Sequence, residues 1–361
     1  MDGVDVACID VRGEFADLEM HIVGTHFLPY LPEMKARLIG AQSGSVAEAS
    51  ELNFIVAKLF AEAVNEFLSI QNIDRNTIDA IGSHGQTLFH STSRNEGEKS
   101  TFQIGSPSII AEITGILTIG NFRVRDVAAG GAGAPLVSLA DYILFRDPLR
   151  PVILNNLGSI SNLTVVTPKP EDMLAFDTGP ANMAIDFFAR LIPGNGAGID
   201  SGGTLSAQGI CIPELLKDLK SNSFFKEIPP KSAGYDEFGP VRLAHIAKPY
   251  LKRELRDLLR TAVEFSATTI ADAYKEFVFP KYGFVSRSIF SGGGTHNLFL
   301  MSRIKELLPD MRIESMPSEI ADAKEAIAFA LLANETLSGR AGSLPSITGA
   351  HQPTLLGEIA L

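Results

Sequence analysis

Strand-like and helix-like patterns alternate along both halves of the chain, and this alternation restricts the fold more than any other feature. In the first half, residues 3–10 and 18–28 alternate as strands do, and residues 45–68 then place apolar side chains at helical spacing. In the second half, residues 151–166 predict two strands around a glycine turn, and residues 286–308 predict a strand, a glycine turn and a helix. Such alternation is typical of α/β domains, in which helices pack on a sheet. Because 361 residues exceed one ordinary domain, we predict two α/β domains.

Composition excludes several classes of protein. The net charge is −11, whereas nucleic-acid-binding proteins normally carry a basic face, so we predict no nucleic-acid partner. Cys8 and Cys211 are too few for a disulfide framework, and they do not have metal-ligand spacing, so no protein metal site is predicted. The N-terminal residues lack the pattern of a signal peptide, and no apolar run reaches membrane-spanning length. We therefore predict a cytoplasmic protein with no membrane partner.

The segment LAFDTGPANM, residues 174–183, carries the first candidate catalytic residue. An apolar run leads into Asp177, a Thr-Gly-Pro turn follows, and the next residues have helical periodicity. In a structural interpretation, Asp177 or Thr178 caps this helix and Pro180 occupies its first turn. In a catalytic interpretation, Asp177 is a base at the carboxyl end of a strand, where α/β proteins bind ligands.

Other polar segments also lie where strands are predicted to end. The glycines of SGGGTHN, residues 291–297, allow close approach of a nucleotide, although a plain strand–helix turn explains them equally well. Arg123 follows a predicted strand and precedes a glycine-rich joint, so it is either a substrate-binding arginine or a solvated one. His84 lies in SHGQT, where a structural role is the alternative, and Glu325 lies early in a predicted helix, where the helix dipole alone favours a carboxylate.

Taken together, these segments are far more specific than any one of them. Eight of them occur in a fixed order: DGVD, SHGQT, FRVRDVAAGGAGAPL, NLGSISNL, FDTGPANM, SGGGTHN, KEAIAFA and LPSITGA. In this order the chain resembles the anhydro-N-acetylmuramic acid kinase family along essentially its whole length. The levoglucosan kinases are a related family, and the block LPSITGA favours the first family over the second.

The resemblance implies an actin-like sugar-kinase fold, in which two α/β domains surround a cleft. We expect residues 1–134 to form the N-terminal domain and residues 135–361 the C-terminal domain, with the extreme C-terminus packing back on the first. The implied reaction consumes ATP and water, opens a 1,6-anhydro sugar and phosphorylates its O6, with Mg²⁺ as cofactor. A homodimer is also implied.

The resemblance also implies roles for individual residues. Asp177 matches the catalytic base, and Arg123, Glu325 and His84 match sugar-binding positions. The nucleotide is expected at a set of five residues: Asp2, Gly3, Gly292, Gly293 and Asn297.

The sequence departs from the family pattern at its start. The family's phosphate loop follows a strand, but here only Asp2 and Gly3 of that loop are present. We therefore expect an apolar strand ahead of Asp2, which makes Met1 an internal methionine of a longer natural protein. Tyr235 also stands where the family has an arginine. The alternative function is therefore a catalytically impaired homologue that binds sugar or nucleotide, or an interaction protein; a general phosphatase or ATPase on the same fold is a third.

Overall fold

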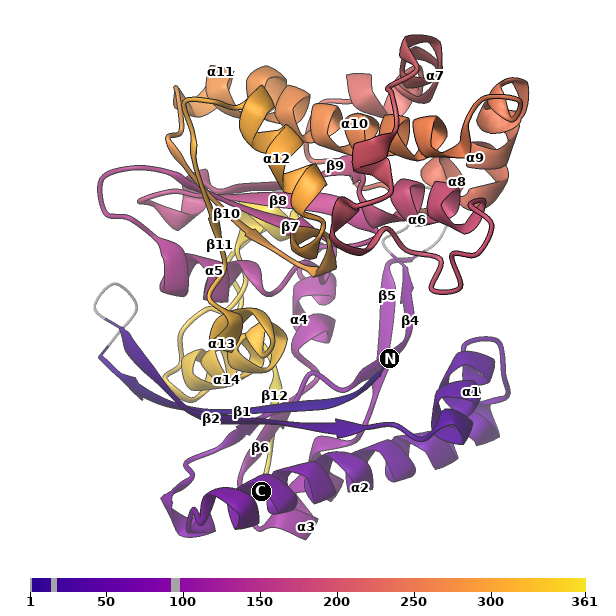
Figure 1. Ribbon diagram of the computed structural model, residues 1–361. Helices are drawn as coiled ribbons and strands as arrows, with labels where there is room; N and C mark the ends of the chain where they lie inside the picture. The colour runs from indigo at the N-terminus through magenta and orange to yellow at the C-terminus, as the bar shows by residue number, and fades with distance from the viewer. Residues whose placement is uncertain (1, 14–17, 92–97) are drawn as a thin grey trace. The chain divides into compact units, whose positions relative to one another are not determined.

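The computed structural model describes residues 2–13, 18–91 and 98–361, so Met1 lies outside the described residues. Its contacts divide the chain into unit 1, residues 1–144 with 318–361, and unit 2, residues 145–317. Each unit combines strands and helices (Figure 1), which confirms the α/β class. The units divide the chain differently from the expected boundary at residue 134, because the last 44 residues (318–361) group with the N-terminal part.

Unit 1 contains seven strands among its described residues, in three sheets. They are β1 (Gly3–Arg12), β2 (Glu19–Pro29), β3 (Ile81–Gly82), β4 (Gln86–Ser91), β5 (Ser100–Ile104), β6 (Thr118–Gly120) and β12 (Glu358–Ala360). β1 and β2 form a long antiparallel ribbon, β4 and β5 form a hairpin, and the third sheet has the order β12-β6-β3. β12 pairs antiparallel with β6 and thereby ties the C-terminal end to the N-terminal part.

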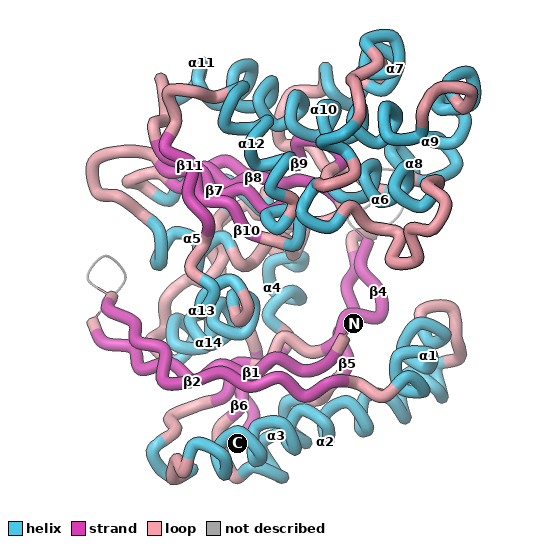
Figure 2. Tube along the Cα trace, in the orientation of Figure 1, coloured by secondary structure: helices cyan, strands magenta, loops and turns pink. Residues whose placement is uncertain are grey.

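The helices of unit 1 cover these sheets (Figure 2). They are α1 (Pro32–Ala41), α2 (Val46–Gln71), α3 (Pro107–Thr114), α4 (Phe122–Ala128), α5 (Ser138–Phe145), α13 (Ser318–Ala321), α14 (Lys324–Leu337) and α15 (Pro345–Thr348). α2 begins where its sequence predicts, since the Ser45 hydroxyl accepts the Glu48 N–H at its N-terminus. Leu52, Val56 and Phe67 lie on its buried face.

Unit 2 is built on one five-stranded sheet of order β11-β10-β7-β8-β9. The strands are β7 (Val152–Leu157), β8 (Ile160–Val166), β9 (Leu174–Pro180), β10 (Arg287–Ser291) and β11 (Arg312–Ser315). β7, β10 and β11 are parallel, and β8 is antiparallel to both β7 and β9. The carboxyl ends of β7, β9 and β10 therefore lie at the same edge of the sheet.

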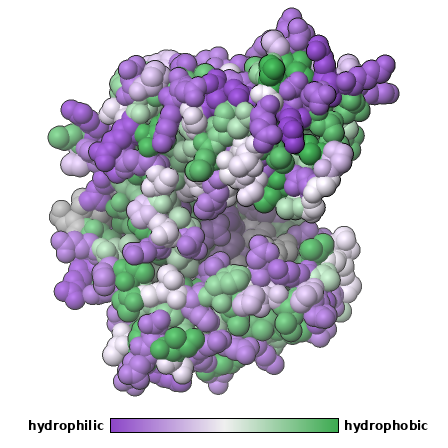
Figure 3. All heavy atoms as spheres, in the orientation of Figure 1, coloured by the Kyte–Doolittle hydropathy of each residue, from purple (hydrophilic) through white to green (hydrophobic). Residues whose placement is uncertain are grey.

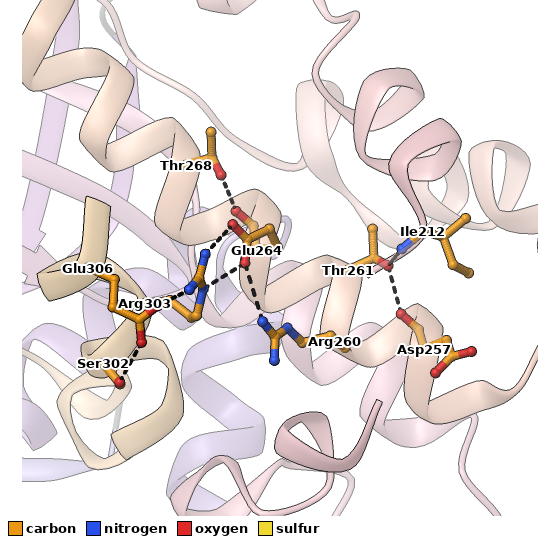
Figure 4. A network of polar contacts seen from close by, with 9 residues as sticks. All are labelled: Ile212, Asp257, Arg260, Thr261, Glu264, Thr268, Ser302, Arg303 and Glu306. Atoms are coloured by element: carbon orange, nitrogen blue, oxygen red, sulfur yellow. Dashed lines mark hydrogen bonds and ion pairs between the residues drawn. The ribbon is translucent and has the colours of Figure 1, made fainter. Parts of the chain in front are cut away.

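Helices pack on this sheet and on one another. They are α6 (Asn182–Arg190), α7 (Pro213–Leu219), α8 (Tyr235–Phe238), α9 (Pro240–Ala247), α10 (Leu255–Ala273), α11 (Phe279–Tyr282) and α12 (Leu298–Leu307). α10 is almost entirely buried at its centre, and Arg303 of α12 binds Glu264 of α10 through two hydrogen bonds of 2.9 and 3.0 Å (Figure 4). The carboxylate of Glu264 raises the pKa of the Arg303 guanidinium, as expected for a close ion pair. This pair fixes α12, and with it the end of the glycine turn that precedes α12.

Hydrophilic and hydrophobic residues are interspersed on the face drawn in Figure 3. Within the described ranges, no helix has both the length and the apolar character needed to cross a bilayer.

Candidate active-site residues in the two units

Asp177 lies within a strand and caps no helix. β9 continues past it to Pro180, and α6 begins only at Asn182, with no side chain capping its N-terminus. The capping interpretation is therefore wrong, and so is the expectation that the strand ends at Asp177. The backbone of β9 continues because Ser161 and Ile160 of β8 pair with Gly179 and Pro180.

The strand register places four polar residues in one row across the sheet. Ser291 of β10 pairs with Asn156 of β7, Asn156 pairs with Asn162 of β8, and Asn162 pairs with Asp177 of β9. Ser291 and Asp177, at the two ends of this row, are separated by three inter-strand spacings, or about 14 Å. Asp177 and the glycine turn after β10 therefore occupy the same carboxyl edge of unit 2, where α/β sheets bind ligands.

A β-bulge directly follows Asp177. Between Ser161 and Asn162 the register shifts, so Thr178 is an extra residue on β9. Thr178 is buried, and its hydroxyl bonds the Ser161 hydroxyl at 2.7 Å. Ser161 also accepts from the Asn155 amide, whose oxygen accepts from the buried Tyr274 hydroxyl. Bulges re-aim neighbouring side chains, and this buried network holds the bulge, and thus Asp177, in one conformation.

Two hydrogen bonds attach Asp177 to the segment that precedes α8. The Asp177 N–H donates to the Lys231 carbonyl at 3.0 Å, and the Ala233 N–H donates to Asp177 Oδ2 at 2.7 Å. Burial raises the pKa of Asp177 to about 6; the Ala233 N–H acts in the opposite direction, and the negative charge of Glu237 adds to the increase. A carboxylate with such a pKa is largely ionised at neutral pH, yet basic enough to accept a proton.

Lys231 anchors this segment. Lys231 as a whole residue is only 3% exposed, and its ammonium group donates to the Phe224 carbonyl at 3.0 Å. The same group lies 4.6 and 4.5 Å from the ring centres of Phe224 and Phe277, which is a cation–π arrangement. Burial lowers the pKa of Lys231. No signal in the sequence pointed to Lys231, because its partners are brought together only by folding.

The glycine turn after β10 has two distinct glycines. Gly292 has a φ of +84°, and a side chain there would lie 2.5 Å from the Asn156 amide oxygen, so the close approach to β7 requires glycine. A side chain on Gly293 would meet nothing nearer than the Asn182 amide at 4.0 Å, so the backbone there borders open space. Asn297 is buried and caps α12, since its Oδ1 accepts the Leu300 N–H at 2.9 Å.

In unit 1, Arg123 and His84 are in direct contact. Arg123 lies on α4 rather than in a loop, and its Nε donates to His84 Nε2 at 2.9 Å. A second hydrogen bond of 2.6 Å joins Arg123 Nη1 to the Gly133 carbonyl. Burial lowers the pKa of His84 to about 4, and the Arg123 charge adds to this effect. His84 is therefore neutral, and Nε2 is its acceptor nitrogen.

The acidic candidates of unit 1 lie near this pair. Glu325, in the first turn of α14, is exposed, and its charge partly offsets the burial that lowers the pKa of Arg123. The pKa of Asp5, on β1, is raised by burial and then by Glu325. Asp2 is exposed and forms a 3.2 Å ion pair with Lys35, and Gly3 begins β1. The structure thus brings Arg123 and His84 into contact, and Glu325 lies close enough for its charge to affect the pKa of Arg123.

Three further polar residues of unit 1 were not predicted as site residues. Asp126 is buried and accepts the Gly133 N–H at 2.7 Å and the Thr348 hydroxyl at 2.8 Å, so it fixes the glycine-rich segment beside Arg123. Lys324 forms a 2.6 Å ion pair with the buried Asp141 and holds the start of α14. His90 Nε2 is buried and has no hydrogen-bond partner among the described residues.

Comparison with known proteins gives a consistent family. A family model described as "Anhydro-N-acetylmuramic acid kinase" matches residues 1–361. A protein of that name from Caldanaerobacter subterraneus subsp. tengcongensis is 39% identical over 375 residues, which cover 100% of this chain and 94% of the relative. Another from Bacillus cereus (strain ZK / E33L) is 36% identical over 373 residues, covering 99% and 96%. A solved structure, component A of the Acidaminococcus fermentans (R)-2-hydroxyglutaryl-CoA dehydratase, gives a TM-score of 0.41 at 11% identity, covering 91% of this chain and 96% of that chain, too low to define the fold.

Proposed function

Because the chain belongs to the anhydro-N-acetylmuramic acid kinase family, we propose that it opens 1,6-anhydro-N-acetylmuramic acid with water and phosphorylates O6 at the expense of ATP. Membership of this family carries the actin-like sugar-kinase architecture, and the two α/β units agree with it. The observation that carries the proposal, beyond the family match, is the half-buried carboxylate of Asp177, with its raised pKa, beside a bulge at the carboxyl edge of its sheet.

Asp177 acts as the general base. It removes a proton from water, the resulting hydroxide attacks the anomeric carbon, and the bond from that carbon to O6 breaks. O6 keeps the electron pair of the broken bond and attacks the γ-phosphorus of ATP, and ADP leaves. The proton stays on Asp177 until it is released to solvent. The elevated pKa of about 6 suits this role, because the same carboxylate accepts and later releases one proton near neutral pH.

Arg123, His84 and Glu325 bind the sugar from unit 1. Arg123 is held by His84 and Gly133, so its remaining guanidinium N–H groups are oriented toward a substrate carboxylate or hydroxyl. Neutral His84 cannot repel this arginine. The buried Nε2 of His90 is one more group able to contact a sugar hydroxyl.

The nucleotide binds at the turn after β10, with Asp2 and Gly3 as further candidates from unit 1. Gly292 allows the turn to pass close to Asn156, and Gly293 leaves its backbone beside open space, so a nucleoside fits this turn. Mg²⁺ that enters with ATP would supply charge neutralisation at the phosphates. Asn297 contributes by holding α12 in place behind the turn.

The decisive experiment measures ADP formation with 1,6-anhydro-N-acetylmuramic acid, with levoglucosan and without sugar. We expect ADP only with the first sugar, and we expect the ³¹P NMR spectrum of the product to show a 6-phosphate.

Asp177→Asn should lower turnover by about 10²–10⁴-fold, the usual contribution of a general base. Asp186→Asn is the matched control, because Asp186 is a half-buried carboxylate of α6 outside the row of polar residues. ADP formation that is independent of sugar would favour the ATPase alternative, and the absence of any turnover would favour an impaired homologue.

Two finer proposals concern location and assembly. We propose that the protein is cytoplasmic, because both cysteines are free thiols. From the family resemblance, we also propose that it forms a homodimer. Light scattering of the purified protein measures the assembly: a mass of one chain at all concentrations would contradict the homodimer.

A further inference from the structure

Asp126 is a fully buried carboxylate that the proposed reaction uses neither as a base nor as a ligand. It lies on α4 and is 0% exposed. Its Oδ2 accepts the Gly133 N–H at 2.7 Å, and its Oδ1 accepts the Thr348 hydroxyl at 2.8 Å. Both of these partners are neutral groups. Burying a carboxylate is costly unless hydrogen bonds satisfy it, so these two contacts hold Asp126 in the interior.

Asp126 and Arg123 hold Gly133 from two directions. They are three residues apart on α4 and therefore lie on one face of the helix. Arg123 Nη1 donates to the Gly133 carbonyl at 2.6 Å, and Asp126 accepts the Gly133 N–H. Gly133 has a φ of +68°, a conformation that favours glycine, and a side chain there would lie 2.7 Å from Val127 Cγ2. The position of the carbonyl that Arg123 binds therefore depends on the direction of the Asp126 carboxylate.

The glycine-rich segment ahead of Gly133 passes directly beside the same carboxylate. A side chain on Gly131 would lie 2.2 Å from Asp126 Oδ2, so only glycine lets the backbone approach this closely. The Gly131 N–H also donates to the Asp126 backbone carbonyl at 2.9 Å. Because the carboxylate lies inside the turn of residues 129–133, its rotation would displace the turn.

A segment from the far end of the chain fixes the orientation of this carboxylate. We call residues 345–351, which comprise α15 and the three residues after it, the α15 segment. Thr348 is 4% exposed; its carbonyl accepts the Ala132 N–H at 2.7 Å, while its hydroxyl binds the carboxylate. The His351 N–H donates to the Ala129 carbonyl at 2.9 Å. The α15 segment therefore binds both the turn and the carboxylate inside it.

We propose that Thr348 and Asp126 are positioning residues for Arg123, and that the α15 segment acts on sugar binding through them. This inference rests on the proposed role of Arg123 in binding the sugar. Hydrogen bonds link the Thr348 hydroxyl to Asp126, Asp126 to the Gly133 backbone, and Gly133 to Arg123. His84 holds the Nε of the same arginine at 2.9 Å. Because the guanidinium N–H groups form a rigid fork, moving the Gly133 carbonyl would tilt the N–H groups that face the sugar.

Thr348→Val removes the hydroxyl and keeps the size of the side chain. Asp126 Oδ1 then lacks its donor, so the carboxylate can rotate and the Gly133 carbonyl can move away from Arg123. We expect the Kd and KM for 1,6-anhydro-N-acetylmuramic acid to rise roughly tenfold, with kcat and the KM for ATP nearly unchanged, because a loss of uniform binding raises KM alone. Thr348→Ser keeps the hydroxyl and should recover most of the loss.

Thr336→Val is the matched control. Thr336 is another buried threonine of unit 1, 6% exposed, and its hydroxyl donates to the Leu332 and Leu356 carbonyls rather than to Asp126. Both valine variants remove a buried hydroxyl that donates to an oxygen, so both should lower the temperature of thermal unfolding. Only Thr348→Val should weaken the binding of the sugar.

A double-mutant cycle with Arg123→Lys distinguishes positioning from general damage to the fold. Lysine keeps the positive charge but has no fork that the Gly133 carbonyl could orient. Isothermal titration gives the sugar Kd of the parent, of each single variant and of the double variant. Since Thr348 is proposed to act through Arg123, the double variant should bind within about twofold of Arg123→Lys, whereas independent effects would multiply.

Two results would overturn the proposal. The first is an unchanged sugar Kd in Thr348→Val, and the second is a loss that persists in full in the Arg123→Lys background. Either result in a parent chain that binds and phosphorylates the sugar contradicts the positioning role alone. A parent chain that binds ATP but no anhydro sugar contradicts the proposed function and, with it, the role of Arg123. If Thr348→Val does not fold, Thr348→Ala takes its place in the same cycle.

Discussion

At the scale of single residues, the titration of Asp177 sets the expected pH dependence. Its pKa is raised by burial to about 6, and only the ionised carboxylate removes a proton from water. We predict that kcat/KM falls about tenfold per pH unit below about pH 6, and that Asp186→Asn leaves this limb unchanged. His84 should not add a second bend to the pH profile near 6.5, its ordinary pKa, because its pKa in the fold is lowered to about 4. A profile that stays flat down to pH 5 would show that another group is the base.

The same carboxylate should lower the stability of the fold. The pKa of Asp177 is near 3.8 in the unfolded chain and about 6 in the folded protein. Between these two pH values the folded protein keeps the proton on Asp177, whereas the unfolded chain has released it. The free energy of unfolding therefore falls as pH rises through this window. We predict that Asp177→Asn is more stable than the parent at pH 7 and that this difference disappears below about pH 4. Thermal unfolding at both pH values tests the prediction, which fails if Asp177→Asn is less stable at pH 7.

His84 tests whether Arg123 needs a neutral acceptor. His84→Leu removes the acceptor at 2.9 Å, whereas His84→Gln supplies an amide oxygen. A hydrogen bond to a charged group contributes about 1.5–3 kcal/mol, so His84→Leu should lower kcat/KM by about 10–100-fold. The loss should fall mainly on KM, because Arg123 is proposed to bind sugar, and His84→Gln should recover part of it. Equal effects of both variants would contradict the positioning role.

At the scale of elements, the bulged strand and the Lys231 segment act together. The β9 ladder with β8 holds one side of Asp177, and the segment anchored by Lys231 supplies two backbone hydrogen bonds to the other side. The bulge network fixes the backbone at Asp177, and the Ala233 N–H holds its carboxylate from the other side.

Lys231→Met should loosen this segment. It removes the donor to the Phe224 carbonyl and both cation–π contacts, and leaving a buried acceptor unpaired costs about 1–3 kcal/mol. As the Ala233 N–H withdraws, the pKa of Asp177 should rise, and the acidic limb of kcat/KM should move to higher pH. Denaturant unfolding and the pH profile measure the two effects. Lys226→Met, at an exposed lysine of the same region, should change neither.

At the scale of the whole molecule, the two units differ in how the chain builds them. Unit 2 is continuous in sequence, and all five strands of its sheet lie within residues 145–317. Unit 1 requires two distant segments, because β12 pairs with β6 and Thr348 binds the buried Asp126.

We predict that residues 145–317 fold when expressed alone, whereas residues 1–144 alone do not. The excised unit 2 keeps its complete sheet and core, and the fragment 1–144 lacks β12 and α14. Circular dichroism and amide dispersion in NMR spectra distinguish the two outcomes. Cooperative unfolding of the 1–144 fragment would show that the C-terminal segment is dispensable to unit 1.

The elements that the sequence determined are those with local signals. α2 was predicted from its 3.6-residue periodicity of apolar residues and from the cap at Ser45. The strand, glycine turn and helix of residues 286–308 were predicted because the spacing of apolar residues changes from that of a strand to that of a helix at a run of glycines. The ordered blocks likewise sufficed to identify the family, because each block is a short contiguous segment. Asp177, Arg123, His84 and Glu325 were found in this way, and their roles stay predictions.

Only the tertiary structure decided the features that depend on distant partners. β9 continues past Asp177 because β8 supplies a ladder and Thr178 forms a bulge, and neither is visible in the pattern of residues 174–180. Arg123 has His84 as its acceptor because α4 packs beside the segment after β3, 39 residues away in sequence. The family resemblance implied that the extreme C-terminus packs on the first domain, and the structure supplies the contact, since Glu358–Ala360 forms a ladder with β6. Helical periodicity and helix caps involve residues close together along the chain, so the sequence specifies them directly. Hydrogen bonds and burial between distant residues depend on distance in space, so they are settled only when the chain folds.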